Sequence, residues 1–249
     1  NPFAGNEQSV QARLLILAEG AQTGTSQPHS PAAESTRIRD YAQVAIVAQV
    51  QTQAAHENRA YERFTPQGPL ALLPDKDGFA LVWCVNQQSA SELEKMNEHD
   101  FLSRLGNTFG GRLGRFIACS ERRSFPLFLR YQPKNTDPAV IRIGNAAQML
   151  HPVAGQGLNL GLRDAWELAQ VFTSPDDSIP WNEIAATYTK QRRADRRLEI
   201  SLTDSLVRIF THPGNLAGAA RGAALLAMDA SPSARRILAR IMMYGLRSR

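Results

Sequence analysis

The sequence contains little cysteine and no long hydrophobic run. Only Cys84 and Cys119 are cysteines among 249 residues, and two cysteines cannot build a disulfide framework. The five histidines show no ligand spacing with them, so we predict no metal site. The most apolar stretches, 79–85 and 222–228, are far shorter than the ~20 residues of a membrane-spanning helix. These absences exclude a disulfide-rich secreted domain, a zinc module and an integral membrane protein.

The composition that remains is typical of a folded protein. The chain has 28 Lys and Arg against 23 Asp and Glu, a net charge of +5, and 43% hydrophobic residues. That balance rules out a disordered chain, and the length suffices for one large or two modest cores. No secretory signal opens the sequence, so we expect a cytoplasmic protein. We predict no nucleic-acid partner.

The order of predicted elements indicates a mixed α/β fold. Residues 12–18 read ARLLILA, which is typical of a buried strand in a parallel sheet. Apolar and polar residues alternate over 43–51, as in a half-exposed antiparallel strand. Further strands are predicted at 59–64, 70–73, 79–85, 116–124 and 139–144, and residues 74–78, which end in Asp-Gly, predict a hairpin between 70–73 and 79–85. The period is helical over 91–109, 158–172, 181–210 and 213–249, and new helices could begin at Pro180, Pro213 and Pro232.

The segment with the clearest chemical signal joins the strand at 139–144 to the next helix. Gly155, Gly157 and Gly161 form G-x-G-x-x-x-G at the helix entrance. Glycines there let the backbone approach a flat or anionic ligand, and the helix N-terminus favours negative charge on it. The spacing alone fits either a nucleotide-binding loop or a glycine-rich helix cap.

The complete sequence of residues 144–165, GNAAQMLHPVAGQGLNLGLRDA, resembles the second FAD-binding motif of the flavin-dependent aromatic hydroxylases. It is most similar to their ubiquinone-biosynthesis branch, as are residues 59–83, 112–114 and 203–207. In that family a G-x-G-x-x-G unit for the ADP half of FAD comes first. No such motif precedes Arg13, so we expect a fragment that binds FAD poorly and is inactive alone.

The resemblance implies a domain organisation. Residues 1–35 and 139–178 would belong to a Rossmann-like FAD-binding domain. Residues 36–138 would form an inserted antiparallel β-sheet domain for the substrate, and residues 179–249 a C-terminal helical region.

The resemblance also implies the residues that hold the flavin. The first two residues of the motif would contact the ribityl and pyrophosphate part of FAD, and Asn145 replaces the aspartate of the wider family. The loop and helix start would lie against the isoalloxazine ring, with helix N–H groups facing its pyrimidine edge. The predicted cofactor-binding residues are Gly144, Asn145, Pro152, Gly155, Gln156, Gly157, Leu158 and Asn159.

Three polar residues of the motif allow two interpretations each. Asn159 contacts the flavin or caps its helix. Asp164 is a ligand or stabilises the helix and the neighbouring loop. His151, the candidate catalytic residue, positions substrate or shuttles a proton, or it serves packing and hydrogen bonding.

The reaction that the resemblance implies is hydroxylation of a phenol ring with O2, FAD and NAD(P)H as the reductant. The substrate would be a polyprenylated phenol, 2-octaprenyl-6-methoxyphenol, in ubiquinone biosynthesis. One sheet face is a candidate wall for this substrate, although we expect most of its side chains to be plain core; it carries Tyr61, Phe64, Leu70, Leu72 and Phe125. Two alternatives stay open: a related flavin enzyme acting at another ring position or on another prenyl substrate, and a non-catalytic fragment or complex subunit.

The C-terminal segment predicts a basic amphipathic helix. Ser231 and Pro232 suit an N-cap and a first helical position. No acidic residue follows Asp229. This helix either packs on the domain or docks on anionic lipid or a partner subunit, with peripheral contact at the inner membrane. Its arginines are Arg235, Arg236, Arg240, Arg247 and Arg249.

Overall fold

A computed structural model of the chain describes residues 11–18, 20, 36–132, 137–173, 180–211 and 215–244. Its smaller sheet pairs β1 (Leu15–Leu17) in parallel with β8 (Val140–Arg142). This pairing confirms a parallel strand within 12–18. The prediction that this strand is buried was wrong, because β8 is its only partner in the described part of the chain. Leu15 is 50% exposed and Ile16 41%.

The larger sheet has seven antiparallel strands around the long central strand β2 (Arg37–Thr52). The strand order is β3-β4-β5-β2-β7-β9, and β6 also pairs with β2. The predicted hairpin is present, since Asp75 lies opposite Gly78 across a two-residue turn. The other strands are β3 (Tyr61–Thr65), β4 (Gly68–Asp75), β5 (Gly78–Asn86), β6 (Phe116–Cys119), β7 (Arg123–Tyr131) and β9 (Gln148–Met149).

Two predicted elements are each divided in the structure. The single helix predicted at 91–109 is two helices, because the Asn97 side chain accepts a hydrogen bond from the Asp100 N–H (2.9 Å) and starts a new one. The strand predicted at 116–124 is likewise two strands, β6 and β7. The helices are α2 (Gln87–Lys95), α3 (Glu98–Phe109), α4 (Gln156–Phe172), α5 (Trp181–Thr211), α6 (Asn215–Ala230) and α7 (Pro232–Tyr244).

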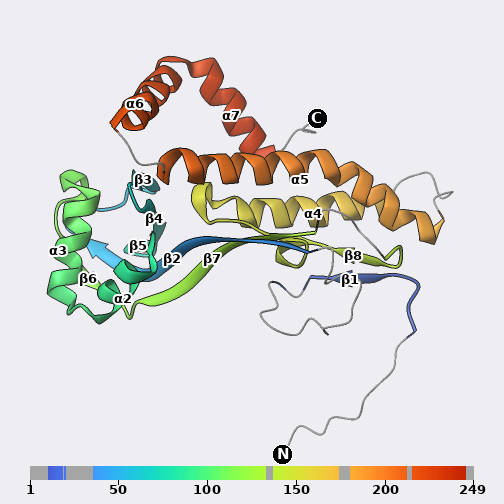
Figure 1. Ribbon diagram of the computed structural model, residues 1–249, viewed down its shortest axis with the longest axis horizontal. Helices are drawn as coiled ribbons and strands as arrows, with labels where there is room; N and C mark the ends of the chain where they lie inside the picture. Colours follow the sequence, from blue (N-terminus) through green and yellow to red (C-terminus); the bar gives the residue numbers. More distant parts are fainter. Residues whose placement is uncertain are drawn as a thin grey trace, which may run out of the picture.

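The helices cover two separate parts of the sheets. α5 lies along α4 beside β8 and the start of β2, whereas α2 and α3 pack at the other end of the larger sheet (Figure 1). α6 and α7 form a hairpin beyond α5 (Figure 1). Across the described ranges, no helix combines the length and apolar composition that crossing a bilayer requires.

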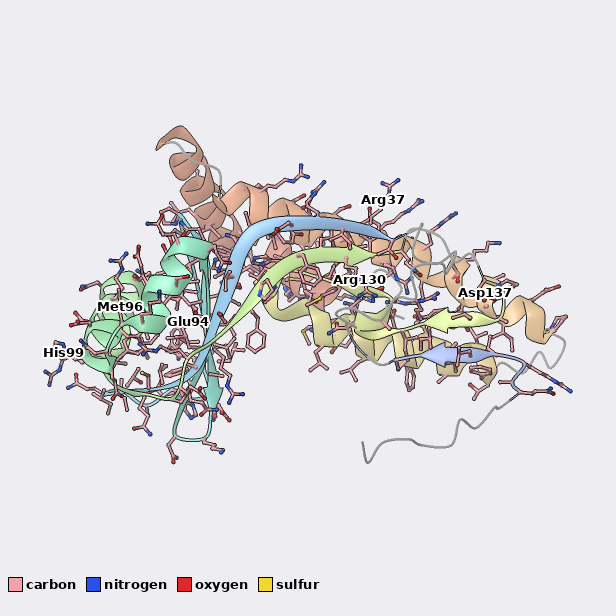
Figure 2. All side chains as sticks on the ribbon, turned by 60° about the horizontal axis from the view of Figure 1, so that its bottom comes forward. Arg37, Glu94, Met96, His99, Arg130 and Asp137 are labelled. Carbon is pink, nitrogen blue, oxygen red and sulfur yellow. The ribbon has the colours of Figure 1, made fainter. Side chains whose placement is uncertain are left out.

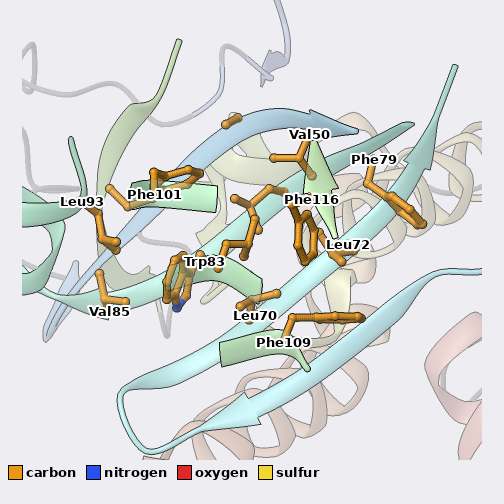
Figure 3. Packing of buried hydrophobic residues seen from close by; sticks show 14 of the residues in the cluster. Val50, Leu70, Leu72, Phe79, Trp83, Val85, Leu93, Phe101, Phe109 and Phe116 are labelled. Carbon is orange, nitrogen blue, oxygen red and sulfur yellow. The ribbon is translucent and has the colours of Figure 1, made fainter. Parts of the chain in front are cut away.

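The main apolar core lies between the larger sheet and helices α2 and α3 (Figure 3). Val44, Ile46, Ala48 and Val50 are all buried in it, which confirms the alternation predicted for β2. Mixed α/β architecture with an antiparallel sheet and C-terminal helices is thus confirmed, while the domain boundaries stay a prediction.

Candidate functional site

The turn after β8 is held in one conformation by glycine and by a buried carboxylate. Gly144 has φ 57°, in the left-handed region that glycine tolerates best. Its N–H donates to Oδ2 of Asp164 at 3.0 Å. A Cβ added to Gly161 would lie 3.5 Å from the Gly144 Cα, so α4 passes close to the turn. The interpretation of Asp164 as a loop-stabilising residue is confirmed.

The start of α4 exposes backbone donors rather than a side-chain cap. Gly155 is the N-cap residue, with φ 61°, and as a glycine it makes no side-chain cap hydrogen bond. A Cβ at Gly155 or Gly157 would have no neighbouring atom within 4 Å. Asn159 lies inside the helix, so the interpretation of it as the helix cap was wrong. A ligand can therefore approach the bare N-terminus of α4.

These glycines open onto a cavity of about 800 Å³. It brings six of the eight predicted cofactor residues together with His151. The remaining two, Gln156 and Asn159, are not among its lining residues. The six are Gly144, Asn145, Pro152, Gly155, Gly157 and Leu158.

The facing wall of the cavity comes from β3, β4 and β5. Tyr61, Ala71, Leu73 and Val82 line it. Of the candidate wall residues, Tyr61 lines the cavity, whereas the two on β4 are core residues, the outcome expected for most of the set. Leu70 and Leu72 are fully buried in the apolar core instead. Both faces of β4 are apolar and its side chains alternate, so the residue pattern could not decide which face meets the cavity.

Two other aromatic residues that were candidates for the wall do not line the cavity. Phe125, also predicted for the wall, is 51% exposed and does not line the cavity. Phe64, in β3, does not line it either. The wall therefore consists of Ala71, Leu73 and Val82 beside Tyr61 and Glu62.

His151 is buried at the edge of the cavity with both ring nitrogens engaged. Its Nδ1 accepts from the Val153 N–H at 3.1 Å, so Nε2 carries the proton that it donates to Oε1 of Gln43 at 3.0 Å. The Tyr41 ring packs edge-on against the imidazole ring, with the two ring centroids 5.1 Å apart. Burial lowers the pKa of His151 to about 4, so the ring is neutral at pH 7. Gln43 is buried beside His151, although the alternation along β2 predicts that it lies on the polar side of the strand.

The carboxylate of Asp164 connects the turn to α5. It is fully buried, and besides Gly144 it accepts from Nε2 of Gln148 (2.8 Å) and from Nε of Arg192 (2.9 Å). Arg192 also donates to Asp195, one helical turn further on. A buried charge of this kind is stable only when paired and hydrogen-bonded.

Arg163 extends the same network along α4 and α5. It donates to Asp195 at 3.1 Å and to Glu199 at 2.6 Å. Burial raises the pKa of Glu199, and Arg163 partly offsets that effect. Arg192, Asp195 and Glu199 recur at intervals of three and four on one face of α5. That spacing was the signal in the sequence for a charged face directed at α4.

The site as a whole can bind a flat ligand between the bare helix start and an apolar sheet face. Backbone N–H groups at the start of α4 can donate to an electron-rich edge, and the sheet face offers apolar contact area. Within the ranges that the structure describes, no three His, Cys, Asp or Glu side chains gather closely enough to hold a metal ion.

Comparison with known proteins agrees with this geometry. Residues 2–197 match a family model described as "FAD binding domain". The ubiquinone hydroxylase UbiL of Rhodospirillum rubrum is 35% identical over 82% of this chain and 48% of its own length. The 3-demethoxyubiquinol 3-hydroxylase of Escherichia coli is 32% identical over 76% of this chain and 46% of its own. The chain thus spans about half the length of these relatives.

The fold also matches a solved structure. The crystal structure of PqsL, a probable FAD-dependent monooxygenase from Pseudomonas aeruginosa, aligns with a TM-score of 0.62. The alignment covers 80% of this chain and 56% of that protein, at 21% identity. At this identity the match concerns the fold.

Proposed function

Because the chain belongs to the FAD-binding domain family, we propose that it supplies the flavin-facing part of an FAD-dependent aromatic hydroxylase of ubiquinone biosynthesis. The observation that carries the proposal is the cavity where the Gly144 turn, the start of α4 and the β3–β5 wall meet. The names of the two relatives, both hydroxylases of ubiquinone compounds, support it.

The residues present fit a flavin. The Cβ positions of Gly155 and Gly157 face open space, which leaves room for a ring at van der Waals distance from the backbone. The uncapped N–H groups of α4 suit the pyrimidine edge of the flavin, where negative charge develops on reduction. Gly144 and Asn145, in the turn that Asp164 holds, would contact the ribityl and pyrophosphate part.

Bound FAD, with NAD(P)H as the reductant, would supply the activation of O2, one atom of which enters the ring while the other leaves as water. The protein orients the ring and excludes water. Leu73, Val82 and Leu158 provide apolar contact area in the cavity. In this proposal His151 is a positioning residue: it fixes the loop before α4 through Val153 and the central strand through Gln43.

The outer surface of this region supports a larger flavin domain around it. Leu158, Leu162 and Trp166 form an apolar stripe along α4 with exposed fractions of 72%, 61% and 67%. Leu15 and Ile16 on β1 are exposed as well. We expect further strand and helix segments of the whole protein to cover these side chains.

We assign the substrate to the class of polyprenylated phenols, with 2-octaprenyl-6-methoxyphenol as the specific candidate. The names of the two relatives describe different ubiquinone compounds, so the hydroxylated carbon is the point that product analysis must identify. A flavin enzyme acting at another ring carbon is the alternative within the same class.

The test compares glycines in the whole protein that contains this chain. Gly157→Val should abolish flavin retention, because its side chain enters the space proposed for the ring. Gly222→Val on α6, whose Cβ position is also open, is the matched control and should retain flavin. Flavin content follows from the visible absorption spectrum of the purified proteins. Normal flavin content in Gly157→Val would contradict the placement of the ring.

Activity is tested on the same preparation. The wild-type protein with NAD(P)H, O2 and a short-chain prenylphenol should release a product that has gained one oxygen atom, detected by mass spectrometry. A flavin-loaded protein that oxidises NAD(P)H but leaves each ubiquinone-type phenol unchanged would overturn the substrate class.

A further inference from the structure

A second cavity, of about 410 Å³, lies at the junction of the two sheets and α5. It shares no lining residue with the proposed flavin cavity. Its volume falls within the range of small-ligand pockets, about 300–1,000 Å³. We call it the arginine pocket, because five of its thirteen lining residues are arginines. They are Arg37, Arg142, Arg193, Arg196 and Arg197.

The five arginines come from three separate parts of the fold. Arg37 begins β2, and Figure 2 shows it at that end of the strand, next to the part of β7 that carries Arg130. Arg142 ends β8. The other three belong to α5. Sequence order alone would not reveal this convergence, since more than 150 residues separate Arg37 from the α5 arginines.

No carboxylate lines the arginine pocket. Among the described residues, Arg37, Arg142, Arg193 and Arg197 form no ion pair with an acidic side chain. Arg196 pairs with Asp164, with Nη2 and Oδ1 3.7 Å apart, so the other four arginines are the ones without an acidic partner in the described ranges. Positive charges gathered without counter-charges repel one another, and a bound anion relieves that repulsion.

The other polar groups of the pocket are suited to oxyanions. Tyr131, Gln132, Thr189 and Ser201 line it alongside the arginines, and each side chain can donate a hydrogen bond. Guanidinium groups bind phosphate oxygens in pairs, with a geometry that favours Arg over Lys. A single carboxylate would neutralise one of five charges, whereas a diphosphate neutralises several.

We propose that the arginine pocket binds a ligand that carries a diphosphate or two neighbouring phosphate groups. This chemistry has two sources, a soluble diphosphate ester and the headgroup of an anionic phospholipid. The site is separate from the proposed flavin function and would exist even if that function were wrong.

The first experiment titrates inorganic pyrophosphate into the chain by calorimetry at constant ionic strength, with sulfate as the comparison anion. Wild type should bind pyrophosphate saturably and more tightly than sulfate. Arg193→Ala/Arg197→Ala should weaken binding by about tenfold or more, since charge-assisted hydrogen bonds are lost. Both side chains are exposed, and circular dichroism checks that the variant folds.

The matched control removes the same charge elsewhere. Lys190→Ala/Arg236→Ala changes two exposed cations on α5 and α7 and should leave the dissociation constant within about twofold of wild type. Equal losses in the two double variants would overturn the pocket in favour of general charge attraction.

Gly157→Val separates this site from the start of α4: loss of pyrophosphate binding in that variant would also overturn the proposal. Absence of saturable binding by both probes, pyrophosphate and vesicles, would overturn it as well.

Vesicles distinguish the two sources. Sedimentation uses phosphatidylcholine vesicles with and without diphosphatidylglycerol, a lipid with two phosphates. If vesicle binding needs diphosphatidylglycerol, is lost in Arg193→Ala/Arg197→Ala and is displaced by pyrophosphate, the ligand is a lipid headgroup. If pyrophosphate binds to the pocket and vesicles do not compete, the ligand is a soluble diphosphate.

Discussion

Two regions of this molecule are stabilised in different ways. Between the larger sheet and α2–α3, the interior is a continuous cluster of aliphatic and aromatic side chains (Figure 3). Between α4 and α5, buried arginines and carboxylates alternate around Asp164. Apolar packing is non-directional and stabilises the fold as a whole. Hydrogen bonds to charged groups are directional, so the second region can hold one backbone turn, that of Gly144, in a defined place.

The comparison explains why the cavity lies where the two regions meet. The apolar region supplies the wall residues Ala71 and Leu73 on the reverse side of β4. The charged region supplies the turn and the start of α4. His151 and Gln43 join the two regions by a hydrogen bond. A flat cofactor needs both an apolar face and fixed donors, and each region provides one of them.

Breaking the charged region should have the largest effect. Asp164→Ala removes one of the two carboxylates that pair with the buried Arg192 and leaves Asp195 as the other. It should reduce the free energy of unfolding by about 3 kcal/mol, measured by urea denaturation. Flavin content should fall as well, because the Gly144 N–H loses its acceptor. Asp229→Ala, which removes a carboxylate that is 79% exposed, is the control and should change stability by about 0.5 kcal/mol or less.

A double variant sharpens this test. Asp164→Leu/Arg192→Met replaces the charge pair with apolar side chains and should recover most of the lost stability. It should not recover flavin content, since leucine cannot accept from Gly144. Recovery of both properties would show that the network contributes stability only, and that it does not position the turn.

Breaking the apolar region should affect stability without a specific effect on the flavin. Leu105→Ala in α3 removes a fully buried side chain and should cost about 3 kcal/mol. At temperatures where the variant stays folded, its flavin content should equal that of wild type. Ile117→Ala, at a residue that is 54% exposed, should be nearly neutral. A specific loss of flavin in Leu105→Ala would contradict the division into two regions.

The junction between the regions should respond to pH. Since burial lowers the pKa of His151 to about 4 from an ordinary 6.5, the unfolded chain binds a proton in this range that the folded protein does not. Stability should therefore decrease as pH falls from 6.5 towards 4, by about 2 kcal/mol between pH 6.5 and 4.5. His151→Gln, which cannot titrate, should show a correspondingly flatter profile in denaturation experiments. Parallel profiles would refute a buried neutral histidine.

Helix α7 belongs to neither region and should show the smallest effect on stability. It begins at Pro232 as predicted, and the Ala234 N–H donates to the Ser231 hydroxyl at 3.4 Å. None of its residues is fully buried, and Ile237, Met243 and Tyr244 are 56–61% exposed. The residues after Tyr244, which include Arg247 and Arg249, lie outside the described ranges.

We propose that α7 makes the peripheral contact with an anionic membrane. Replacing Arg235, Arg236 and Arg240 by alanine should change unfolding by about 0.5 kcal/mol or less per site. It should weaken binding to anionic vesicles by roughly 1 kcal/mol per arginine, in low salt. Sedimentation beside wild type measures this, and equal recovery of both proteins with the vesicles would leave α7 without a membrane role.

The sequence by itself determined the elements and the motif. Local patterns predicted the alternation in β2, the Asp75–Gly78 turn and the helices after Leu158. The sequence of residues 144–165 identified the flavin family. The sequence could not choose between the two apolar faces of β4. It also predicted α2 and α3 as one helix, because the apolar pattern continues across the break at the Asn97 cap. Those choices depend on what packs against each face, which local sequence does not contain.

Only the tertiary structure decided which polar residues meet. Gln43 and His151 are 108 residues apart in the chain, and Gly144 and Asp164 are 20 apart. The arginine pocket likewise joins Arg37 to α5. Contacts of this kind depend on strand register and on how helices cross the sheet. Hydrophobic periodicity specifies which side of an element is buried, but it does not specify which charged or polar partner that side will meet.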